Sequence, residues 1–263
     1  MVELTGQSPQ QSSDNLAAAV AAGEIERIVL AGGDGLVHLA IQQLAGTTIP
    51  VSVAPTGTGN DFATAIGIEP SDEILLGDTA GDDTLTNLDL LAVETAHGTT
   101  WVASVVIAGF PAAINRRANS ISLPIGAQVY TLAALIELPS FQRQTLSIEL
   151  DDSALTADSA MLAIGNTKLF GGGMLPCPDA DPTDGLLDLT SIEGVGRIGL
   201  APHLIGRAGG TSERPEVLRL TSTSITIDTP GIDLWGDGEP LGETPATIRA
   251  VPDALWVAGA DIT

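Results

Sequence analysis

The sequence predicts two domains: an amino-terminal α/β domain built on a parallel sheet, and a β-rich domain whose antiparallel strands pack as a sandwich. Two changes of pattern lead to this prediction. Up to about residue 85, apolar strand-like runs alternate with helix-like segments, which is typical of a parallel sheet covered by helices. Beyond that point, short β-branched runs follow one another between turn residues. We expect the α/β domain to comprise residues 1–88 and 250–263, and the sandwich domain residues 89–249.

Helices and strands alternate in the first third of the chain. The clearest helical signal lies in residues 36–44, where apolar side chains stand at Val37 and at the i+3, i+4 and i+7 positions after it. Glycine is a common residue just past the end of a helix, which places one helix end at Gly23. The expected elements are a helix from Ser12 or Ser13 to Gly23, a strand at 25–31, the helix at 36–44, a strand at 49–55 and a short helix at 61–68.

The second part of the chain favours strands. Residues 95–115 contain no Asp, Glu, Lys or Arg, but their continuous apolar part, residues 101–110, is about half as long as a membrane-spanning helix. We therefore expect a buried strand there. Across the second part, strands are expected at 87–93, 100–107, 145–151, 159–166, 185–192, 216–223 and 224–230, with helices at 126–138 and 197–207.

Composition and charge exclude several classes of protein. The chain has 263 residues and a formal net charge of −23, so a nucleic-acid partner is not expected, because phosphate binding needs clustered Lys and Arg. The single cysteine, Cys177, excludes an internal disulfide and a cysteine-cluster zinc site. We expect it to be a half-buried thiol. The first ten residues lack the basic and apolar segments of a signal peptide, so we expect a cytoplasmic protein.

A glycine-rich loop, GGDG at residues 32–35, follows the first expected strand. In a β-α unit such a loop lies against the start of the next helix, where backbone N–H groups and the helix dipole favour an anion such as phosphate. Asp34 would repel a bare phosphate, so its presence points to a bridging Mg²⁺ or a bound hydroxyl group. The alternative from the residues alone is a tight turn with a solvated aspartate.

The same arrangement recurs one β-α unit later, in TGTGNDFA at residues 56–63. Gly57 and Gly59 open the turn, and Thr58 offers a hydroxyl. Asp61 is a candidate for chemistry or, alternatively, for capping the following helix. The spacing completes neither the dinucleotide-binding G-x-G-x-x-G pattern nor the phosphate-binding loop that ends in Gly-Lys.

These loops belong to a longer series of motifs. GDGLVHLAIQQL at 33–44 and PTGTGNDFA at 55–63 are followed by NTKLFGGGMLPCPDADPTDGLLDL at 166–189 and by GDGE at 236–239. In this order they resemble the catalytic domain of the diacylglycerol kinase and sphingosine kinase superfamily, over roughly residues 20–255. The resemblance implies a Rossmann-like amino-terminal sheet and an overall NAD-kinase-like or diacylglycerol-kinase-like fold, with ATP bound between the domains.

The resemblance also implies roles for individual residues, with ATP and Mg²⁺ as cofactors. Glu239 would act as general base on a lipid hydroxyl, with Asp237 beside it. A catalytic Mg²⁺ would be held by Asp34, Asp61 and Asp89, and a structural Mg²⁺ by Asp181, Asp184 and Leu186. The nucleotide would contact Thr5, Gly32, Gly33, Asp34, Gly35, Leu36, Val37, His38, Gly57, Thr58, Gly59 and Asn60.

Each of the later motifs also has an alternative without a ligand. GDGE is compatible with a hairpin turn that carries exposed carboxylates, and residues 181–185 with an ordinary β-turn. The GGGM segment at 171–174 is compatible with a flexible loop, and Asp89 with a solvent-facing position in a strand. From the residues alone these alternatives stay open.

The resemblance favours an ATP-dependent kinase that phosphorylates diacylglycerol or a similar lipid at a membrane surface, as a cytoplasmic protein that associates peripherally with the membrane. The alternatives are a kinase for a sphingoid base or another small alcohol, and a kinase-like protein that binds without catalysis. Relative to the superfamily fold, we expect this sequence to begin at the second strand. The neighbouring strand would then have an unpaired edge, unless a partner covers it, as in a homodimer, or the true start lies upstream.

Overall fold

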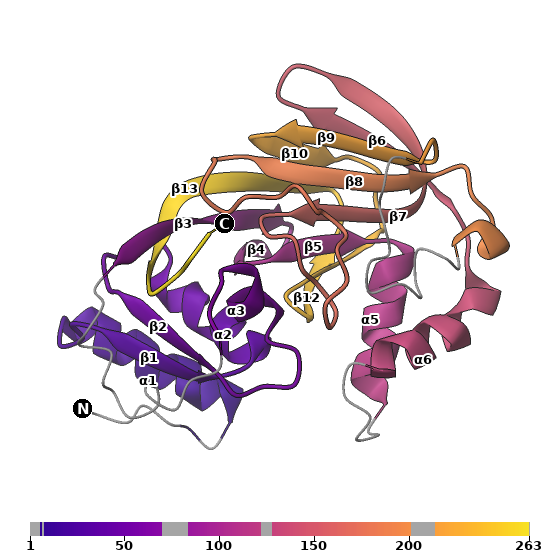
Figure 1. Ribbon diagram of the computed structural model, residues 1–263. Helices are drawn as coiled ribbons and strands as arrows, with labels where there is room; N and C mark the ends of the chain where they lie inside the picture. The colour runs from indigo at the N-terminus through magenta and orange to yellow at the C-terminus, as the bar shows by residue number, and fades with distance from the viewer. Residues whose placement is uncertain (1–5, 7, 70–83, 122–127, 201–213, 263) are drawn as a thin grey trace.

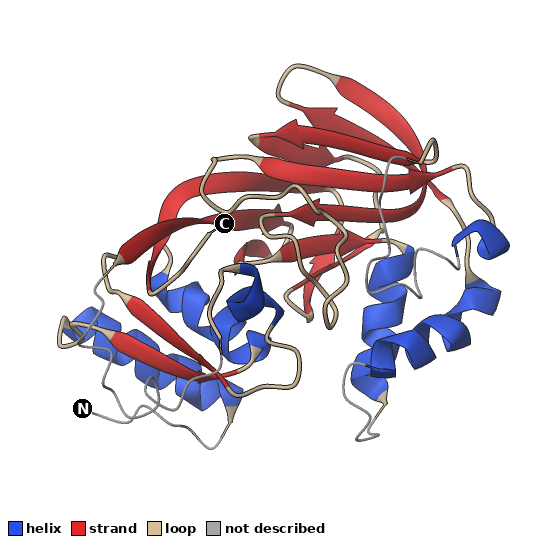
Figure 2. Ribbon diagram, in the orientation of Figure 1, coloured by secondary structure: helices blue, strands red, loops and turns tan. Residues whose placement is uncertain are grey.

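The computed structural model describes residues 6, 8–69, 84–121, 128–200 and 214–262. Thr5, expected to contact the nucleotide, lies outside the described residues, as does most of the helix expected at 197–207. The chain forms a helix-covered amino-terminal domain beside a larger β domain, and a pair of helices packs at one end of the β domain (Figures 1 and 2). No helix in the described ranges is both long and apolar enough to cross a membrane.

The amino-terminal domain has the predicted alternation of elements. Its first helix starts three or four residues earlier than expected, because Pro9 is well suited to a first helical turn and the Ser8 hydroxyl accepts a hydrogen bond from Gln11 N. Its end at Gly23 is confirmed. The elements are α1 (Pro9–Ala22), β1 (Ile28–Gly32), α2 (Asp34–Leu44), β2 (Val51–Pro55) and α3 (Asp61–Ala65), and β1 pairs with β2 in parallel.

The β domain contains the expected strands and four more. Residues 100–107 form two strands rather than one, β4 (Gly98–Val102) and β5 (Val105–Ala108). The strands β11 (Asp233–Gly236), β12 (Glu239–Glu243) and β13 (Ala246–Ala258) were not predicted, and GDGE lies in the hairpin between β11 and β12. The others are β3 (Leu85–Thr95), β6 (Gln144–Leu150), β7 (Ala154–Gly165), β8 (Leu187–Glu193), β9 (Val217–Ser222) and β10 (Ser224–Ile227).

Two helices and a 3₁₀ turn interrupt the strands. The helix α6 (Gln128–Glu137) was expected, and it runs into η1 (Leu138–Ser140). The helix α5 (Phe110–Ser120) was missed, because the uncharged segment before it was interpreted as a continuous strand. Pro111 stands in the first turn of α5, where a missing N–H costs nothing. Both helices pack on the outer side of β7 and β8 through an apolar cluster that includes Phe110, Ala133 and Phe141.

Strand β13 connects the two domains. Along one edge it pairs with β3, and along the other it pairs first with β10 and then, at Val257, with Val51 of β2. The hydrogen-bonded strands thus form one continuous sheet in the order β1-β2-β13-β10-β6-β7-β5-β11-β12, with β3, β4, β8 and β9 attached at its branches. In the β domain these strands close around a shared core as a sandwich.

The amino-terminal domain has a separate core, which the carboxyl-terminal residues join. Side chains of β1, α2 and α3 pack with Leu88 and Leu90 of β3 and with Leu255 and Val257 of β13. The expected division of the chain at residues 88 and 250 stays a prediction. Strand β1 lies at the end of the sheet and pairs only with β2 among the described strands.

Candidate active site

The two glycine loops of the amino-terminal domain touch each other. The N–H of Thr56 donates to the Gly32 carbonyl at 3.0 Å, and a Cβ atom added to Gly57 would lie 2.5 Å from the Gly33 Cα. Only glycine fits at this crossing, because any larger residue would force the loops apart. The side chain of Asn60, itself at φ 57°, bonds the backbone N–H and carbonyl of Gly57 at 3.0 and 2.9 Å.

Asp34 begins the helix α2 and faces the second loop. Its Oδ1 accepts a hydrogen bond from Phe62 N at 3.0 Å, which ties α2 to the start of α3. Further along α2, Val37 is buried and Leu36 is half-buried in the domain core. Their backbone N–H groups donate to the Gly33 carbonyl, at 2.9 Å from Leu36 and 3.3 Å from Val37, so these two predicted nucleotide contacts are engaged within the turn that starts α2.

Asp61 joins the two domains rather than capping a helix. The N-cap position of α3 belongs to Asn60, and both carboxylate oxygens of Asp61 accept hydrogen bonds from the GGGM loop, at 2.7 Å from Gly172 N and 2.9 Å from Gly173 N. The capping alternative is therefore wrong. Burial raises the pKa of Asp61, the two N–H donors oppose that shift, and the nearby negative charge of Asp34 adds to it.

The GGGM loop has a defined conformation at this junction. Its three glycines all have positive φ, of 65°, 85° and 93°, which brings successive N–H groups to face one carboxylate. Phe170 and Met174 close the loop with two backbone hydrogen bonds of 3.0 and 3.1 Å. The alternative of an unstructured flexible loop does not hold.

Asp237, in the turn of the β11–β12 hairpin, is bound from three directions. Its Oδ2 lies 3.2 Å from Nδ1 of His38 in α2 and accepts from Ala103 N at 2.8 Å, while its Oδ1 accepts from Ser104 N at 2.9 Å. Its side chain is only 3% exposed. GDGE is therefore a hairpin turn, as the alternative had it, but the aspartate of that turn is buried. The imidazole of His38, predicted to contact the nucleotide, is directed to this carboxylate.

The other residues of the turn are held from α5. The carbonyl of Gly238 accepts hydrogen bonds from the side-chain amides of Asn115 at 3.2 Å and Asn119 at 3.0 Å. Asp237 and Gly238 have φ values of 50° and 88°, as in the tight turns that match the twist of a two-residue hairpin. Glu239 follows this anchored turn and is exposed. The hydrogen bonds to Asp237 and Gly238 therefore hold the backbone next to Glu239, while its side chain reaches solvent.

Three of the predicted carboxylates influence the titration of one further side chain. Burial raises the pKa of Tyr130 on α6, and the negative charges of Asp61, Asp34 and Glu239 raise it further.

Asp89 is directed to a different place. It is buried, and its Oδ2 accepts from Gly185 N at 2.7 Å while its Oδ1 accepts from Asp253 N at 3.1 Å. Its own N–H donates to the Pro182 carbonyl at 2.7 Å. The solvent-facing alternative is wrong, and the described contacts of Asp89 are with the turn at 181–186 rather than with Asp34 and Asp61.

The turn at 181–186 gathers negative charge. Asp181 accepts from the N–H and hydroxyl of Thr183, and Asp184 accepts from Leu186 N at 2.9 Å, as in an ordinary β-turn. Burial and the nearby carboxylates of Asp184, Asp179 and Asp181 raise the pKa of Asp188 to about 6. A cation bound at this turn would relieve that repulsion.

No group of three or more His, Cys, Asp or Glu side chains is arranged to hold a metal ion in the part of the chain that the structure describes. A Mg²⁺ site needs fewer protein ligands, since it commonly uses one or two carboxylates together with phosphate oxygens and water. Asp34 and Asp61, whose charges repel each other, fit such a site. Cys177 is fully buried rather than half-buried, and its pKa is raised to about 12 by burial.

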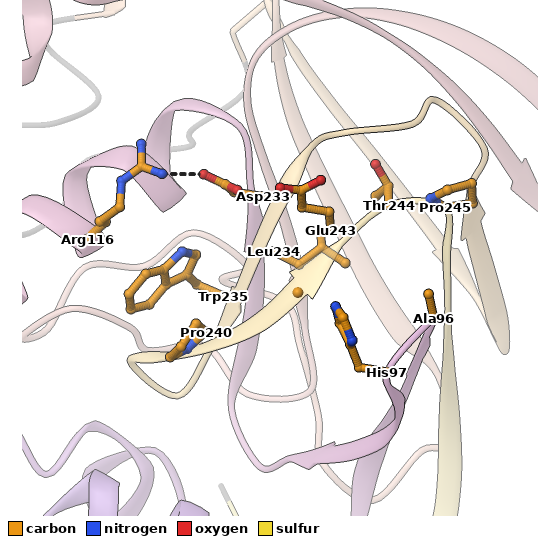
Figure 3. A pocket seen from close by; sticks show the side chains of 11 residues that line it. Ala96, His97, Arg116, Asp233, Leu234, Trp235, Pro240, Glu243, Thr244 and Pro245 are labelled. Atoms are coloured by element: carbon orange, nitrogen blue, oxygen red, sulfur yellow. Dashed lines mark hydrogen bonds and ion pairs between the residues drawn. The ribbon is translucent and has the colours of Figure 1, made fainter.

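A pocket of about 480 Å³ opens beside the hairpin (Figure 3). Trp235 and Pro240 form one side of it, His97 lies opposite, and the ion pair between Arg116 and Asp233 crosses its rim at 2.6 Å. This pocket adjoins the strand that carries Glu239, and none of the predicted site residues lines it.

Several residues of the site were missed in the sequence. Asn115 and Asn119 stand at i and i+4 on one face of α5, a signal that is visible only once that segment is recognised as a helix. A second such signal is the polar stripe of α2, where Asp34 and His38 are followed at the same spacing by Gln42. Its side-chain amide bonds both the N–H and the carbonyl of Trp101 in β4, at 3.0 and 2.8 Å.

Comparison with known proteins agrees with this arrangement. Residues 1–93 match the diacylglycerol kinase catalytic domain, and residues 104–259 match the YegS C-terminal NAD kinase β-sandwich-like domain. The chain is 36% identical over 262 residues to a diacylglycerol kinase of Mycobacterium tuberculosis, which covers 98% of this chain and 84% of that protein. It is 28% identical to the lipid kinase YegS of Escherichia coli, over 88% of this chain and 77% of that one.

Solved structures share the fold. A diacylglycerol kinase from Bacillus anthracis superimposes with a TM-score of 0.71 at 16% sequence identity, over 97% of this chain and 82% of that one. An NAD kinase from Archaeoglobus fulgidus, solved in complex with ATP, gives a TM-score of 0.51 at 11% identity, over 90% and 79% of the two chains. With two family domains in order and a close relative along its whole length, the chain belongs to the diacylglycerol kinase family of lipid kinases.

Proposed function

We propose that this protein transfers the γ-phosphate of ATP to the hydroxyl of diacylglycerol or a closely similar lipid, with Mg²⁺ as the metal. The observation that carries the proposal is the contact between His38 and Asp237, 3.2 Å apart. It joins the helix that starts at the first glycine loop to the hairpin that ends in Glu239, although the two are 199 residues apart in sequence. This contact supports a single site that is formed by the first glycine loop and by Glu239 as the acceptor base.

The nucleotide would lie over the two glycine loops. The crossing of Gly33 and Gly57 presents backbone N–H groups at the start of α2, an 11-residue helix whose dipole favours an anion. The hydroxyl of Thr58 is exposed on the second loop and free to contact a phosphate or ribose. An NAD kinase of similar fold was solved in complex with ATP, which supports ATP as the nucleotide.

The metal would be held by Asp34 and Asp61. When bound, Mg²⁺ offsets charge on the phosphate oxygens during transfer. Asp61 keeps its place through Gly172 and Gly173, and Asp34 keeps its place through Phe62, so both carboxylates are positioned before a metal arrives. The turn with Asp181, Asp184 and the Leu186 carbonyl would hold a second, structural Mg²⁺, and Asp89 would order that turn rather than contact the first ion.

Glu239 would accept the proton of the lipid hydroxyl as that oxygen attacks phosphorus. Its exposed carboxylate follows a turn in which the Asp237 side chain and the Gly238 carbonyl accept hydrogen bonds. The donors come from α2, from the segment between β4 and β5, and from α5, so the backbone of the turn is held in place. A positioned base of this kind contributes roughly 10²–10⁴-fold to a proton-transfer step. His38, Asn115 and Asn119 act as positioning residues because they contact the turn and not the reacting groups.

The test is transfer of labelled γ-phosphate to diacylglycerol dispersed in detergent micelles, with Mg²⁺ present. We expect the native protein to label the lipid and Glu239→Gln to reduce kcat by at least about 100-fold, while the KM for ATP stays within about threefold. The matched control is Glu243→Gln, an exposed glutamate at the other end of the same strand, which should keep nearly full activity. A Glu239→Gln protein with native kcat would refute the base assignment.

Substrate and nucleotide are then tested separately. A panel with diacylglycerol, a sphingoid base and a short-chain alcohol should give the largest kcat/KM for diacylglycerol; a clear preference for another acceptor would redirect the proposal. Calorimetric titration with ATP and Mg²⁺ should give one binding event, weakened at least tenfold in Asp34→Asn. Absence of any binding by the native chain would favour a kinase-like protein that does not catalyse.

A further inference from the structure

The pair of helices α5 and α6 has an outward surface unlike the rest of this acidic protein. The exposed residues of α6 and η1 are all uncharged: Gln128, Thr131, Leu135, Ile136, Pro139 and Ser140. Residues 110–143 contain three arginines and a single acidic residue, in a chain whose formal net charge is −23. A surface helix normally presents charged and polar side chains to water, so this face is suited to a less polar partner.

Apolar side chains project from this face. Among large hydrophobic residues in the described part of the chain, the three with the greatest exposure are Ile198 at 91%, Leu135 at 57% and Ile136 at 48%. Ile198 lies in the helical turn at residues 197–200, after β8, and its neighbours Val195 and Leu200 pack against the same apolar cluster as α5 and α6. The three side chains therefore lie on one lobe of the molecule, which Figure 1 shows at the end of the sheet beyond α5.

The same lobe carries exposed arginines. Arg117 on α5, Arg143 after η1 and Arg197 in the same turn as Ile198 are all exposed. Arg117 pairs with Glu137 at 2.6 Å and Arg143 with Asp158 at 3.1 Å. Exposed pairs of this kind are worth little, so the guanidinium groups can turn to an external anion at small cost.

We propose that this helical lobe is the surface by which the protein docks on an anionic lipid bilayer. Leu135, Ile136 and Ile198 would enter the interface between headgroups and acyl chains, and Arg117, Arg143 and Arg197 would contact lipid phosphates. Apolar insertion and electrostatic attraction are the two contributions that bind a peripheral protein to a membrane. For a chain with so many carboxylates, contact through any strongly acidic face would be repelled.

The position of the lobe matches the acceptor of the proposed reaction, on which this inference rests. Tyr130 and Ala133 of α6 pack in the apolar cluster that α6 shares with α5, whereas Leu135, ~140° further round the helix from Tyr130, is exposed. One side of α6 is thus packed against the protein and another is turned to the surroundings. The lobe adjoins the proposed acceptor site through α5, whose Asn115 and Asn119 bind the Gly238 carbonyl next to Glu239.

The test is co-sedimentation of the full chain with vesicles that contain no diacylglycerol, made of phosphatidylcholine alone or with phosphatidylglycerol. We expect the native protein to bind the phosphatidylglycerol vesicles, and a variant with Leu135→Gln, Ile136→Gln and Ile198→Gln to bind on the order of tenfold more weakly. Arg143→Gln should weaken binding about fivefold, at low salt only. Matched controls outside the lobe are Val29→Gln in the amino-terminal domain, another partly exposed apolar residue, and Arg249→Gln on β13 of the β domain, another exposed ion pair.

Activity on two forms of substrate separates this inference from the proposed function. The triple variant should keep native activity on a short-chain diacylglycerol dissolved as monomers, which also shows that it is folded, and should lose activity on diacylglycerol embedded in vesicles. A native protein that binds vesicles but phosphorylates neither form would support the docking surface and refute the kinase proposal.

Other results would overturn the docking surface. These are vesicle binding by the triple variant that equals that of the native protein, or no vesicle binding by the native protein at all. A dimer in sedimentation velocity that the triple variant abolishes would also overturn it, because a second copy of the chain would then cover this face.

Discussion

Two buried aspartates, Asp61 and Asp237, join the domains of this protein, and they do so in different ways. Asp61 reaches from the amino-terminal domain to two N–H groups of a glycine loop. Asp237 reaches from the β domain to two N–H groups between neighbouring strands and to a histidine on α2. The first junction depends on three glycines, which have no side chains to pack, between the packed residues Phe170 and Met174, and the second depends on sheet and helix. We infer that the Asp61 junction can adjust to a ligand and that the Asp237 junction is fixed.

The largest effect should come from the fixed junction. In Asp237→Asn an amide group would face donors on all sides, so at least one N–H would lose its partner inside the protein. We expect a loss of about 3 kcal/mol in the free energy of unfolding and nearly complete loss of activity. Urea denaturation followed by circular dichroism checks the first, and a loss below about 1 kcal/mol would show that this junction is not fixed.

The crossing of the glycine loops should be next in magnitude. In Gly57→Ala the new Cβ would lie 2.5 Å from the Gly33 Cα, a backbone contact that cannot be relieved by rotating a side chain. We expect a loss of about 2 kcal/mol in unfolding free energy and at least a tenfold rise in the KM for ATP. Gly196→Ala is the matched control, since nothing lies within 4 Å of its added Cβ and it is outside the predicted nucleotide site. Equal KM values in the two variants would argue against a nucleotide at the crossing.

The adjustable junction should respond to Asp61→Asn with little loss of stability. The glycine loop can shift to accept the amide, and the cost of burying the charge disappears, so we expect a change of about 1 kcal/mol or less in unfolding free energy. Activity should nevertheless fall at least 100-fold if Asp61 holds the metal. A destabilisation as large as that of Asp237→Asn would remove the distinction between the two junctions.

The smallest effect concerns Cys177, which lies in the β domain away from both junctions. Burial raises its pKa from 9.0 to about 12. Between those values the unfolded chain loses the thiol proton while the folded chain keeps it, so this thiol makes stability fall as pH rises. Cys177→Ala should therefore have a flatter dependence of unfolding free energy on pH above 9.0 than the native protein. Parallel curves would show that the thiol is not protected by the fold.

The sequence predicted those parts of the molecule in which local pattern and fold coincide. The apolar spacing after Val37 located α2, and the glycines at 32–33 and 57–59 located the loops that meet at the carboxyl ends of β1 and β2. Most strands of the β domain were found from their β-branched runs. The family motifs led to the correct fold class because they mark turns whose geometry depends on particular residues.

The partners of the aspartates could not be predicted in the same way. Asp61, Asp89 and Asp237 accept hydrogen bonds from backbone N–H groups, and backbone donors leave no trace in a sequence because every residue except proline has one. The contact of His38 with Asp237 depends on how the two domains meet. The start of α1 was misplaced for a local reason, since Pro9 and Ser8 together outweigh the serines that follow.

Helix α2 has one further consequence for how the enzyme could move. Three successive turns of this helix form hydrogen bonds with other elements: Asp34 with α3, His38 with the β11–β12 hairpin and Gln42 with β4. A tilt of α2 that moves Asp34 must therefore move the hairpin as well, because Asp34 and His38 lie roughly 6 Å apart along the helix, four residues at 1.5 Å each. Moving the two domains widely apart would break the contacts of His38 and Gln42. We infer that, in the proposed reaction, the distance between the phosphate donor and the lipid acceptor would stay nearly constant while substrates bind and leave.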